Sequence, residues 1–327
     1  MRCFFVFLCL LQSLDVHADL VAEFDRISDE PREVEYTNNL DLDLRGGHLQ
    51  GIQQVGDDFV LSGSSASASY MIVIDGTSGA ASYYPRRPKP FKHAGGFQVS
   101  DGIGVVGIED NRARNASYVD MFALTEAGAF DRENGRSVAT ITRRGARELT
   151  TAGAVGVAVT ESGPLLVVAD WDSRHLDFYR TSEPDIELQT GLSWSVETTA
   201  IRLPREEGES YERFAVLAAE HLDRIGWVDA RWHSYQNVNL FEDEGALYLL
   251  ATATSGGDNI ADLYRVVRAG DRISGLEKVA SRVFKLPDWA KFRWGAGFWR
   301  RADGALVLGV TGEHLERAGK LLVFEPR

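Results

Sequence analysis

Short apolar runs separated by tight polar turns recur along the whole chain. In residues 48–65, HLQGIQQVGDDFVLSGSS, an alternating run is followed by a Gly-Asp-Asp turn and a second, nearly continuous apolar run. Residues 93–110, HAGGFQVSDGIGVVGIED, repeat this order, with histidine, glycine and glutamine at matching places. Apolar alternation joined by a Gly- and Asp-rich turn predicts a β-hairpin in each copy.

Three further copies of this hairpin follow. They are GVAVTESGPLLVVADWD at 156–172, NVNLFEDEGALYLLATATS at 237–255 and GFWRRADGALVLGVTGEH at 297–314. A third strand is predicted after every copy, and a more polar fourth strand after most of them. Four antiparallel strands with a buried inner pair are typical of a propeller blade. The pattern therefore predicts an all-β fold, a five-bladed β-propeller of four-stranded antiparallel blades.

The two ends of the repeat region complement each other. The last copy has only three strands before Arg327, whereas residues 34–44, VEYTNNLDLDL, form a strand with no blade of its own. We expect residues 34–44 to pair with 320–325 and close the ring, which removes a free sheet edge. This divides the chain into residues 1–18, an N-terminal segment at 19–33 and one propeller domain at 34–327. Residues 205–232 are predicted as an insertion; a degenerate sixth blade is the alternative.

The first residues, MRCFFVFLCLLQSLDVHADL, have the features of a secretory signal peptide, with one basic residue, an apolar run and small residues at Val16 and Ala18. Both cysteines of the chain, Cys3 and Cys9, lie in this segment. We therefore expect a secreted or periplasmic protein without disulfides, cleaved after Ala18. No later apolar run approaches twenty residues, which argues against membrane insertion.

Composition narrows the function further. Thirty-two glycines against nine prolines suit a turn-rich β protein. A formal net charge of −13 argues against nucleic acid as the partner, because nucleic-acid binding requires basic patches.

Candidate site residues gather in loops that share one face of a propeller: those entering each innermost strand and those after each second strand. Five of the seven histidines are in these loops, and histidine binds metals and moves protons near neutral pH. Catalytic roles are predicted for His48, His93, Glu109, Asp170 and His233, and ligand contacts for Trp171, Tyr235, Asn237, Trp294 and Glu313. The alternatives are histidines bonded to a neighbouring blade and acidic loops that are merely solvated.

The carboxylates of this face have two possible uses. Grouped carboxylates can form an acid–base pair, and with nearby amides they offer the oxygen ligands that calcium prefers, so a divalent metal such as calcium is a candidate cofactor. Inner-strand amides, Gln53, Gln98 and Asn239, are predicted to bond backbone groups in the channel. Glycines at 51, 96, 156 and 297 are predicted to allow close packing around the axis.

In its repeats the chain resembles five-bladed propellers as an architecture. That class includes carbohydrate-cleaving enzymes, calcium-dependent nucleotidases and lectins. The resemblance implies an exported hydrolase or lyase acting on a glycan or another polar small molecule at the channel mouth. The alternative is a carbohydrate-binding propeller without catalysis, but a lectin repeats its site in every blade, and here the loop residues differ between blades.

Overall fold

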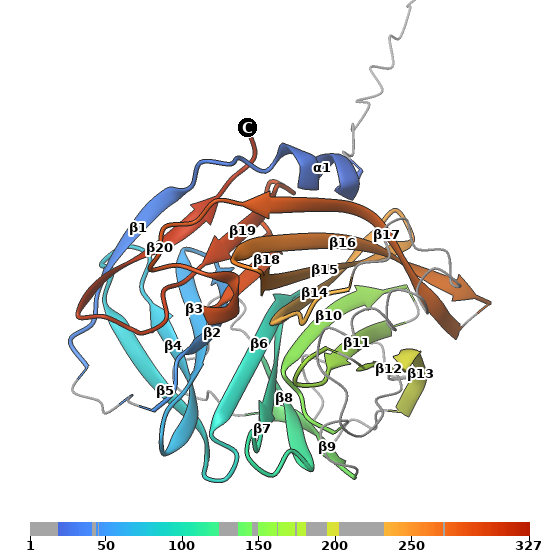
Figure 1. Cartoon of the computed structure of the whole chain (residues 1–327), viewed down its shortest axis with the longest axis horizontal. Coiled ribbons are helices and arrows are strands. Elements are labelled where there is room, and N and C mark those ends of the chain that lie inside the picture. The colour runs from blue at the N-terminus through green and yellow to red at the C-terminus, as the bar shows by residue number, and fades with distance from the viewer. Residues whose placement is uncertain are drawn as a thin grey trace, which may run out of the picture.

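The structure is a computed structural model that describes residues 19–40, 44, 46–123, 137–145, 150–161, 163–173, 175–180, 195–202, 232–270 and 272–327. The expected signal peptide and all of the expected insertion except Trp232 lie outside these residues. Nearly every element is a β-strand (Figure 1), so the prediction of an all-β fold is confirmed. Within the described residues, no helix has the length and apolar character needed to cross a membrane.

The described strands form five antiparallel groups of four. The first contains β2 (Leu49–Val55), β3 (Asp58–Ser64), β4 (Ala68–Ile74) and β5 (Ala81–Pro88). The second contains β6 (His93–Ser100), β7 (Ile103–Glu109), β8 (Ala116–Ala123) and β9 (Ser137–Arg144). The third contains β10 (Ala154–Thr160), β11 (Gly163–Ala169), β12 (His175–Arg180) and β13 (Ser195–Arg202). The fourth contains β14 (Asn237–Asp243), β15 (Ala246–Ser255), β16 (Asp258–Ala269) and β17 (Arg272–Phe284). The fifth contains β18 (Ala296–Arg300), β19 (Leu306–Val310), β20 (Ala318–Phe324) and β1 (Arg32–Thr37).

The fifth group combines the two ends of the chain. Strand β1 pairs with β20 in antiparallel register, from Arg32 opposite Val323 to Thr37 opposite Ala318. The expected pairing is thus present, although the strand ends at Thr37 instead of continuing to residue 44. Asn38 turns the chain, because its Oδ1 accepts the N–H of Leu40 at 3.0 Å.

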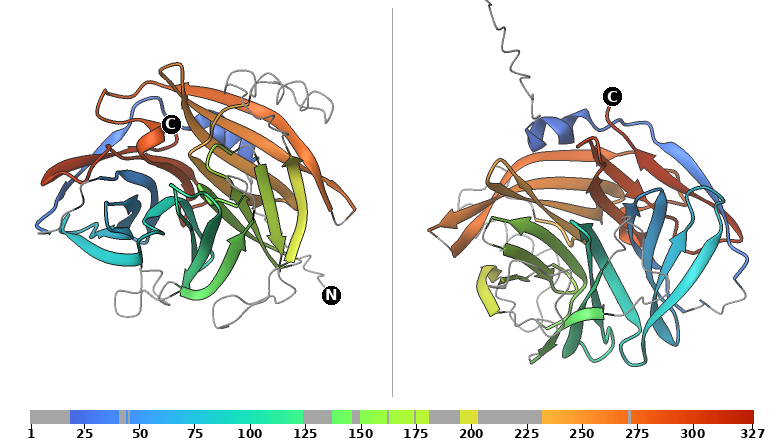
Figure 2. Two further views of the ribbon diagram at one scale, coloured as in Figure 1. Left: turned by 60° about the horizontal axis from the view of Figure 1, so that its bottom comes forward. Right: turned by 180° about the vertical axis from the view of Figure 1, so that it is seen from behind.

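A short helix, α1 (Leu20–Arg26), precedes β1 and was not expected from the sequence. Asp19 caps it by accepting the N–H of Val21 at 3.1 Å. Its apolar face is fully buried, and Phe24 packs on Phe298 of β18 with 6.1 Å between ring centroids. Figures 1 and 2 show α1 beside the C-terminus. Tertiary packing stabilises this seven-residue helix, which is too short to form by itself.

The first strand of each group lies innermost. These strands, β2, β6, β10, β14 and β18, contact one another in succession, and β18 also contacts β2. The C-terminal ends of all five inner strands line one shared cavity, to which β2 contributes Val55 and β18 contributes Arg300. The five inner strands therefore run in the same direction. This arrangement fits a β-propeller. We call the side on which the inner strands begin the entry side, and the opposite side the exit side.

Buried amides fill the centre between the inner strands. Gln98 of β6 donates to the carbonyl of Leu240 at 2.8 Å and accepts the N–H groups of Val157 and Leu240 at 2.9 and 2.7 Å. Gln53 of β2 donates to the carbonyl of Phe298 at 3.1 Å. Asn239 of β14 accepts the N–H of Phe298 at 2.9 Å. The prediction that these amides satisfy backbone groups in the channel is confirmed.

Two of the repeated glycines are required by this crowding. A Cβ on Gly96 would lie 2.3 Å from Oδ1 of Asn237, and one on Gly297 would lie 2.1 Å from the carbonyl oxygen of Ile52. Neither distance is possible for non-bonded atoms. The expected packing role of these glycines is therefore confirmed.

Candidate functional site

The entry side brings together several of the predicted residues. Inner strand β6 begins at His93, and β2 begins directly after His48. The two imidazole centroids are 6.4 Å apart. We call His48, Gln50, His93, Glu109 and Trp171 the entry cluster. Gln50 is not among the ten site residues predicted from the sequence; its place two residues after His48 was the available signal.

His93 and Glu109 form a buried pair. They lie opposite each other in the antiparallel register of β6 and β7, and His93 Nδ1 is 3.1 Å from Glu109 Oε1. His93 is 5% exposed and Glu109 is completely buried. The other carboxylate oxygen of Glu109 accepts the N–H of Ala152 at 2.8 Å. Glu109 is therefore enclosed beside the His93 ring and does not face solvent itself.

Gln50 joins the two histidines. Its Nε2 lies 2.9 Å from Nε2 of His93 and 3.0 Å from Nε2 of His48. Nδ1 of His48 is 2.7 Å from the carbonyl oxygen of Leu49, which can only accept, so this nitrogen carries the proton. The Gln50 amide nitrogen is thus placed to donate to Nε2 of both rings, and it also lies 3.2 Å from Nδ1 of His48. Burial, together with neighbouring His93, lowers the pKa of His48 and so favours its neutral form.

Trp171 adds an aromatic surface to the cluster. Its ring centroid is 5.0 Å from that of His93, and the Arg114 guanidinium lies 4.5 Å from the centre of the indole. The backbone N–H of Trp171 donates to Thr151 Oγ1 at 2.8 Å, which holds the loop after β11. A half-buried indole beside an imidazole and a guanidinium can contact the apolar face of a polar ligand.

Asn237 also lies beside the cluster, whereas Asp170 belongs to a turn. Asn237 donates to the carbonyl of Gln50 at 2.8 Å and so links β14 to β2. Asp170 is 1% exposed, and its Oδ1 accepts the N–H of His175 at 3.2 Å, within the turn that follows β11. The structure therefore gives Asp170 a turn-forming contact.

Tyr235, expected at the mouth, instead lies in the core. It is 1% exposed, and its hydroxyl donates to Asp262 Oδ2 at 2.5 Å. Burial raises its pKa well above the ordinary value, and neighbouring Tyr264 and Asp262 raise it further. His233 is 4% exposed, with its ring centroid 6.0 Å from that of Tyr235. The sequence places both residues in an entry loop but does not show that their side chains turn inward.

Trp294 and Glu313 line a separate pocket of about 420 Å³. Its other lining residues are Tyr36, Trp289, Gly312, His314, Glu316, Ala318, Gly319 and Lys320. It adjoins the entry cluster, because the carbonyl of Glu313 accepts the N–H of Leu49 at 2.9 Å. Trp289 was not singled out in the sequence, although an aromatic residue in a polar turn was a usable signal.

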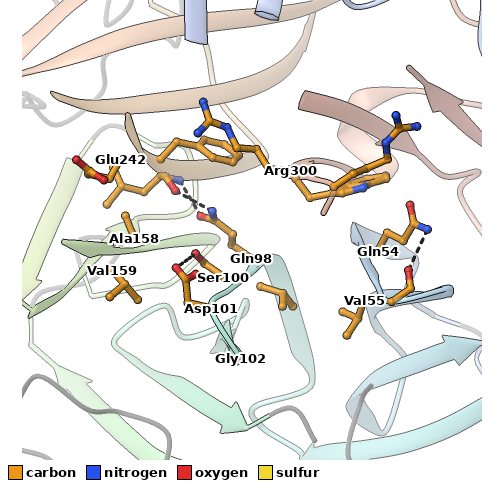
Figure 3. Close-up of a pocket in the computed structure, with 16 residues that line it drawn as sticks. Gln54, Val55, Gln98, Ser100, Asp101, Gly102, Ala158, Val159, Glu242 and Arg300 are labelled. Carbon is orange, nitrogen blue, oxygen red and sulfur yellow. Dashed lines mark hydrogen bonds between the residues drawn. The ribbon is translucent and has the colours of Figure 1, made fainter. Parts of the chain in front are cut away.

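A larger cavity of about 600 Å³ opens on the exit side (Figure 3). Gln98, Asp101 and Glu242 line it together with Arg300. Arg300 is already paired, with Asp243 at 2.7 Å and Glu23 at 3.2 Å. None of the ten predicted site residues lines this cavity. The amides at its floor hold the inner strands together, as described above.

The entry cluster does not fit the expected calcium ion. The described part of the chain contains no group of three or more His, Cys, Asp or Glu side chains placed to hold a metal. Calcium prefers several oxygen ligands, whereas this cluster offers two imidazoles, one amide and the single carboxylate of Glu109.

Comparison with known proteins gives only distant likenesses. No protein-family model matches the chain, and neither does any curated protein. A GH43 endo-arabinanase from Bacillus licheniformis has 12% identity and a TM-score of 0.45, with 89% of this chain and 96% of that chain covered. An exo-1,5-α-L-arabinanase from a bovine ruminal metagenomic library has 11% identity and a TM-score of 0.44, with 85% of this chain and 92% of that chain covered. The catalytic domain of a Coprinopsis cinerea GH62 α-L-arabinofuranosidase has 9% identity and a TM-score of 0.44, with 91% of this chain and 98% of that chain covered. Likenesses at this level do not assign the chain to a family.

Proposed function

We propose that this protein is a glycan-acting enzyme, a hydrolase or a lyase, whose substrate binds at the entry cluster. The His93–Glu109 pair is the single observation that carries the proposal. A buried carboxylate 3.1 Å from Nδ1 of an imidazole favours a proton on that nitrogen, which leaves Nε2 as the group that can accept one. Proton transfer by such a positioned histidine typically contributes about 10²–10⁴-fold to a rate.

The surroundings of His93 support a polar, ring-shaped substrate. The half-buried Trp171 indole can cover the C–H face of a sugar ring, while Arg114 and the Gln50 amide can bond hydroxyl or carboxylate groups. Gln50 would turn away from His93 when a substrate takes its place at Nε2.

Two bond-breaking routes suit this arrangement. In hydrolysis, Nε2 of His93 accepts a proton from water as the water oxygen bonds the sugar carbon; the bond from that carbon to the glycosidic oxygen breaks, and the departing oxygen takes a proton from solvent water. In elimination, Nε2 removes a carbon-bound proton beside a uronate carboxylate, a C=C bond forms, and the glycosidic oxygen departs. Arg114 is the cation that would balance the carboxylate in the second route.

Incubation with a panel of neutral and uronate-containing oligosaccharides tests this proposal. Hydrolysis releases reducing ends alone, whereas elimination also produces an ultraviolet-absorbing unsaturated sugar. His93→Gln and Glu109→Gln should each lower the rate by about 100-fold or more. Glu161→Gln, in an exposed turn, is the matched control and should keep full activity. Full activity in His93→Gln would refute the proposal.

A binding function without catalysis is the second candidate. It is favoured by the near-complete burial of His93 and by the Gln50 amide that already occupies Nε2 of both histidines. Oligosaccharide binding with no product from any member of the panel would establish this alternative.

We also propose that the five strand groups are the blades of a five-bladed propeller, closed by β1, and that the protein is exported. The succession of inner-strand contacts and the β1–β20 pairing support the first statement. The signal-peptide pattern of residues 1–18 supports the second.

A further inference from the structure

The pocket beside the entry cluster has features of a ligand site. Its volume of about 420 Å³ lies within the range of small-molecule sites, about 300–1,000 Å³. Trp289 is 38% exposed and, apart from Val283, is the sole exposed large hydrophobic side chain of the described residues. A large indole held at the surface gives up the stabilisation that burial would provide. That loss is explained if the indole contacts a ligand.

The backbone around Trp289 is held in place. Ala290 forms a β-bridge with Gly312, and its N–H donates to the carbonyl of Pro287 at 2.9 Å. A Cβ on Gly312 would lie 3.5 Å from Cε3 of the Trp289 ring, so the glycine backbone lies against the indole. Trp289 is therefore a fixed aromatic surface and needs little ordering when a ligand binds.

A second aromatic residue and several polar groups line the same pocket. The Trp294 ring has the Lys291 ammonium 5.3 Å and the Arg293 guanidinium 5.2 Å from its centroid. Glu313 and His314 are both about half exposed at their side chains. The pocket thus combines indole surface with hydrogen-bonding groups of both signs.

Tyr36 supplies a buried donor to this pocket. It is 5% exposed, and its hydroxyl accepts the N–H of Glu316 at 3.2 Å. Burial raises the pKa of Tyr36 to about 12, so the hydroxyl keeps its proton. No acceptor for that proton is found in the described part of the chain. Gly319 leaves the space that the phenol occupies, since a Cβ there would lie close to the Tyr36 hydroxyl.

We propose that this pocket binds a saccharide unit of a glycan, with one ring face against Trp289. A sugar ring has an apolar C–H face and a rim of hydroxyl groups. The indoles match the face, and Tyr36, Glu313 and His314 match the rim. The choice of a saccharide as the ligand rests on the proposed function. The pocket adds a second binding position next to the entry cluster. A glycan chain would then extend from the cluster across the fifth strand group.

Affinity electrophoresis through gels that contain arabinan, xylan, β-glucan or homogalacturonan tests the pocket. The first three probes are neutral and the last is acidic, so the panel also identifies the charge of the preferred sugar. At least one probe should retard the unmodified protein. Trp289→Ala should weaken that binding by about tenfold or more, and Tyr36→Phe by several-fold, with melting midpoints near that of the parent. Val283→Ala, which removes the other exposed apolar side chain, should have no effect.

Retardation by no probe, or equal retardation of Trp289→Ala and the parent, would overturn the inference. His93→Gln separates this result from the proposed function. If His93→Gln is retarded like the parent and no glycan is cleaved by either protein, the pocket stands and the catalytic proposal fails. If glycans are cleaved but Trp289→Ala binds and cleaves them like the parent, the pocket is not a saccharide site.

Discussion

Replacing Gln98 by leucine tests whether the central amides hold the inner strands together. Gln98 is 1% exposed and bonds backbone groups of β10 and β14. Leucine is close to glutamine in volume and has no polar atoms, so the change removes the hydrogen bonds and leaves little void.

The structure gives the size of the effect. The leucine side chain leaves the N–H groups of Val157 and Leu240, now 2.9 and 2.7 Å from Gln98 Oε1, without their acceptor in the channel. Leaving one buried donor unsatisfied costs about 1–3 kcal/mol. Leaving both donors unsatisfied therefore predicts a decrease of about 2–6 kcal/mol in the free energy of unfolding.

Urea unfolding followed by tryptophan fluorescence measures this change. Gln54→Leu is the matched control, because within the described residues the Gln54 side chain donates only to the exposed carbonyl of Gly56, at 3.1 Å. We expect the control to change stability by less than about 0.5 kcal/mol. If Gln98→Leu has the same free energy of unfolding as the control, and the same slope of that free energy against urea concentration, these amides do not hold the centre of the fold together.

Three further predictions follow from single features of the chain. Because the pKa of His48 is lowered from 6.5 in the folded protein, the free energy of unfolding should decrease as the pH falls from about 6.5 to the lowered pKa. His48→Gln should remove this part of the pH dependence, which urea unfolding at several pH values measures. An identical pH dependence in the variant would contradict the lowered pKa of His48. Deleting residues 32–37 exposes the edge of β20 and should lower the melting midpoint, so an unchanged midpoint would argue against the role of β1 in closing the fold. Mass spectrometry of the exported protein should find Asp19 as its first residue, whereas an intact Met1 would exclude the predicted cleavage.

The repeating part of the fold could be predicted from the order of residues along the chain. The hairpin turns, the order of the strands and the complementary ends of the repeat region follow from local patterns of apolar residues and glycine. Gln53, Gln98 and the repeated glycines could also be interpreted in advance, because equivalent positions of a repeat occupy equivalent environments. The helix α1 could not, since its stability comes from packing on Phe298.

Which of the predicted site residues meet depends on how the strands pair and pack in three dimensions. His93 and Glu109 are brought together by the register of β6 and β7, and Gln50 by its position between two histidines of different groups. Tyr235 lies just before inner strand β14, as His48 lies just before β2, but the Tyr235 side chain turns into the core. A repeat fixes where a loop begins, whereas the direction of each side chain depends on non-local packing, which differs from one group to the next.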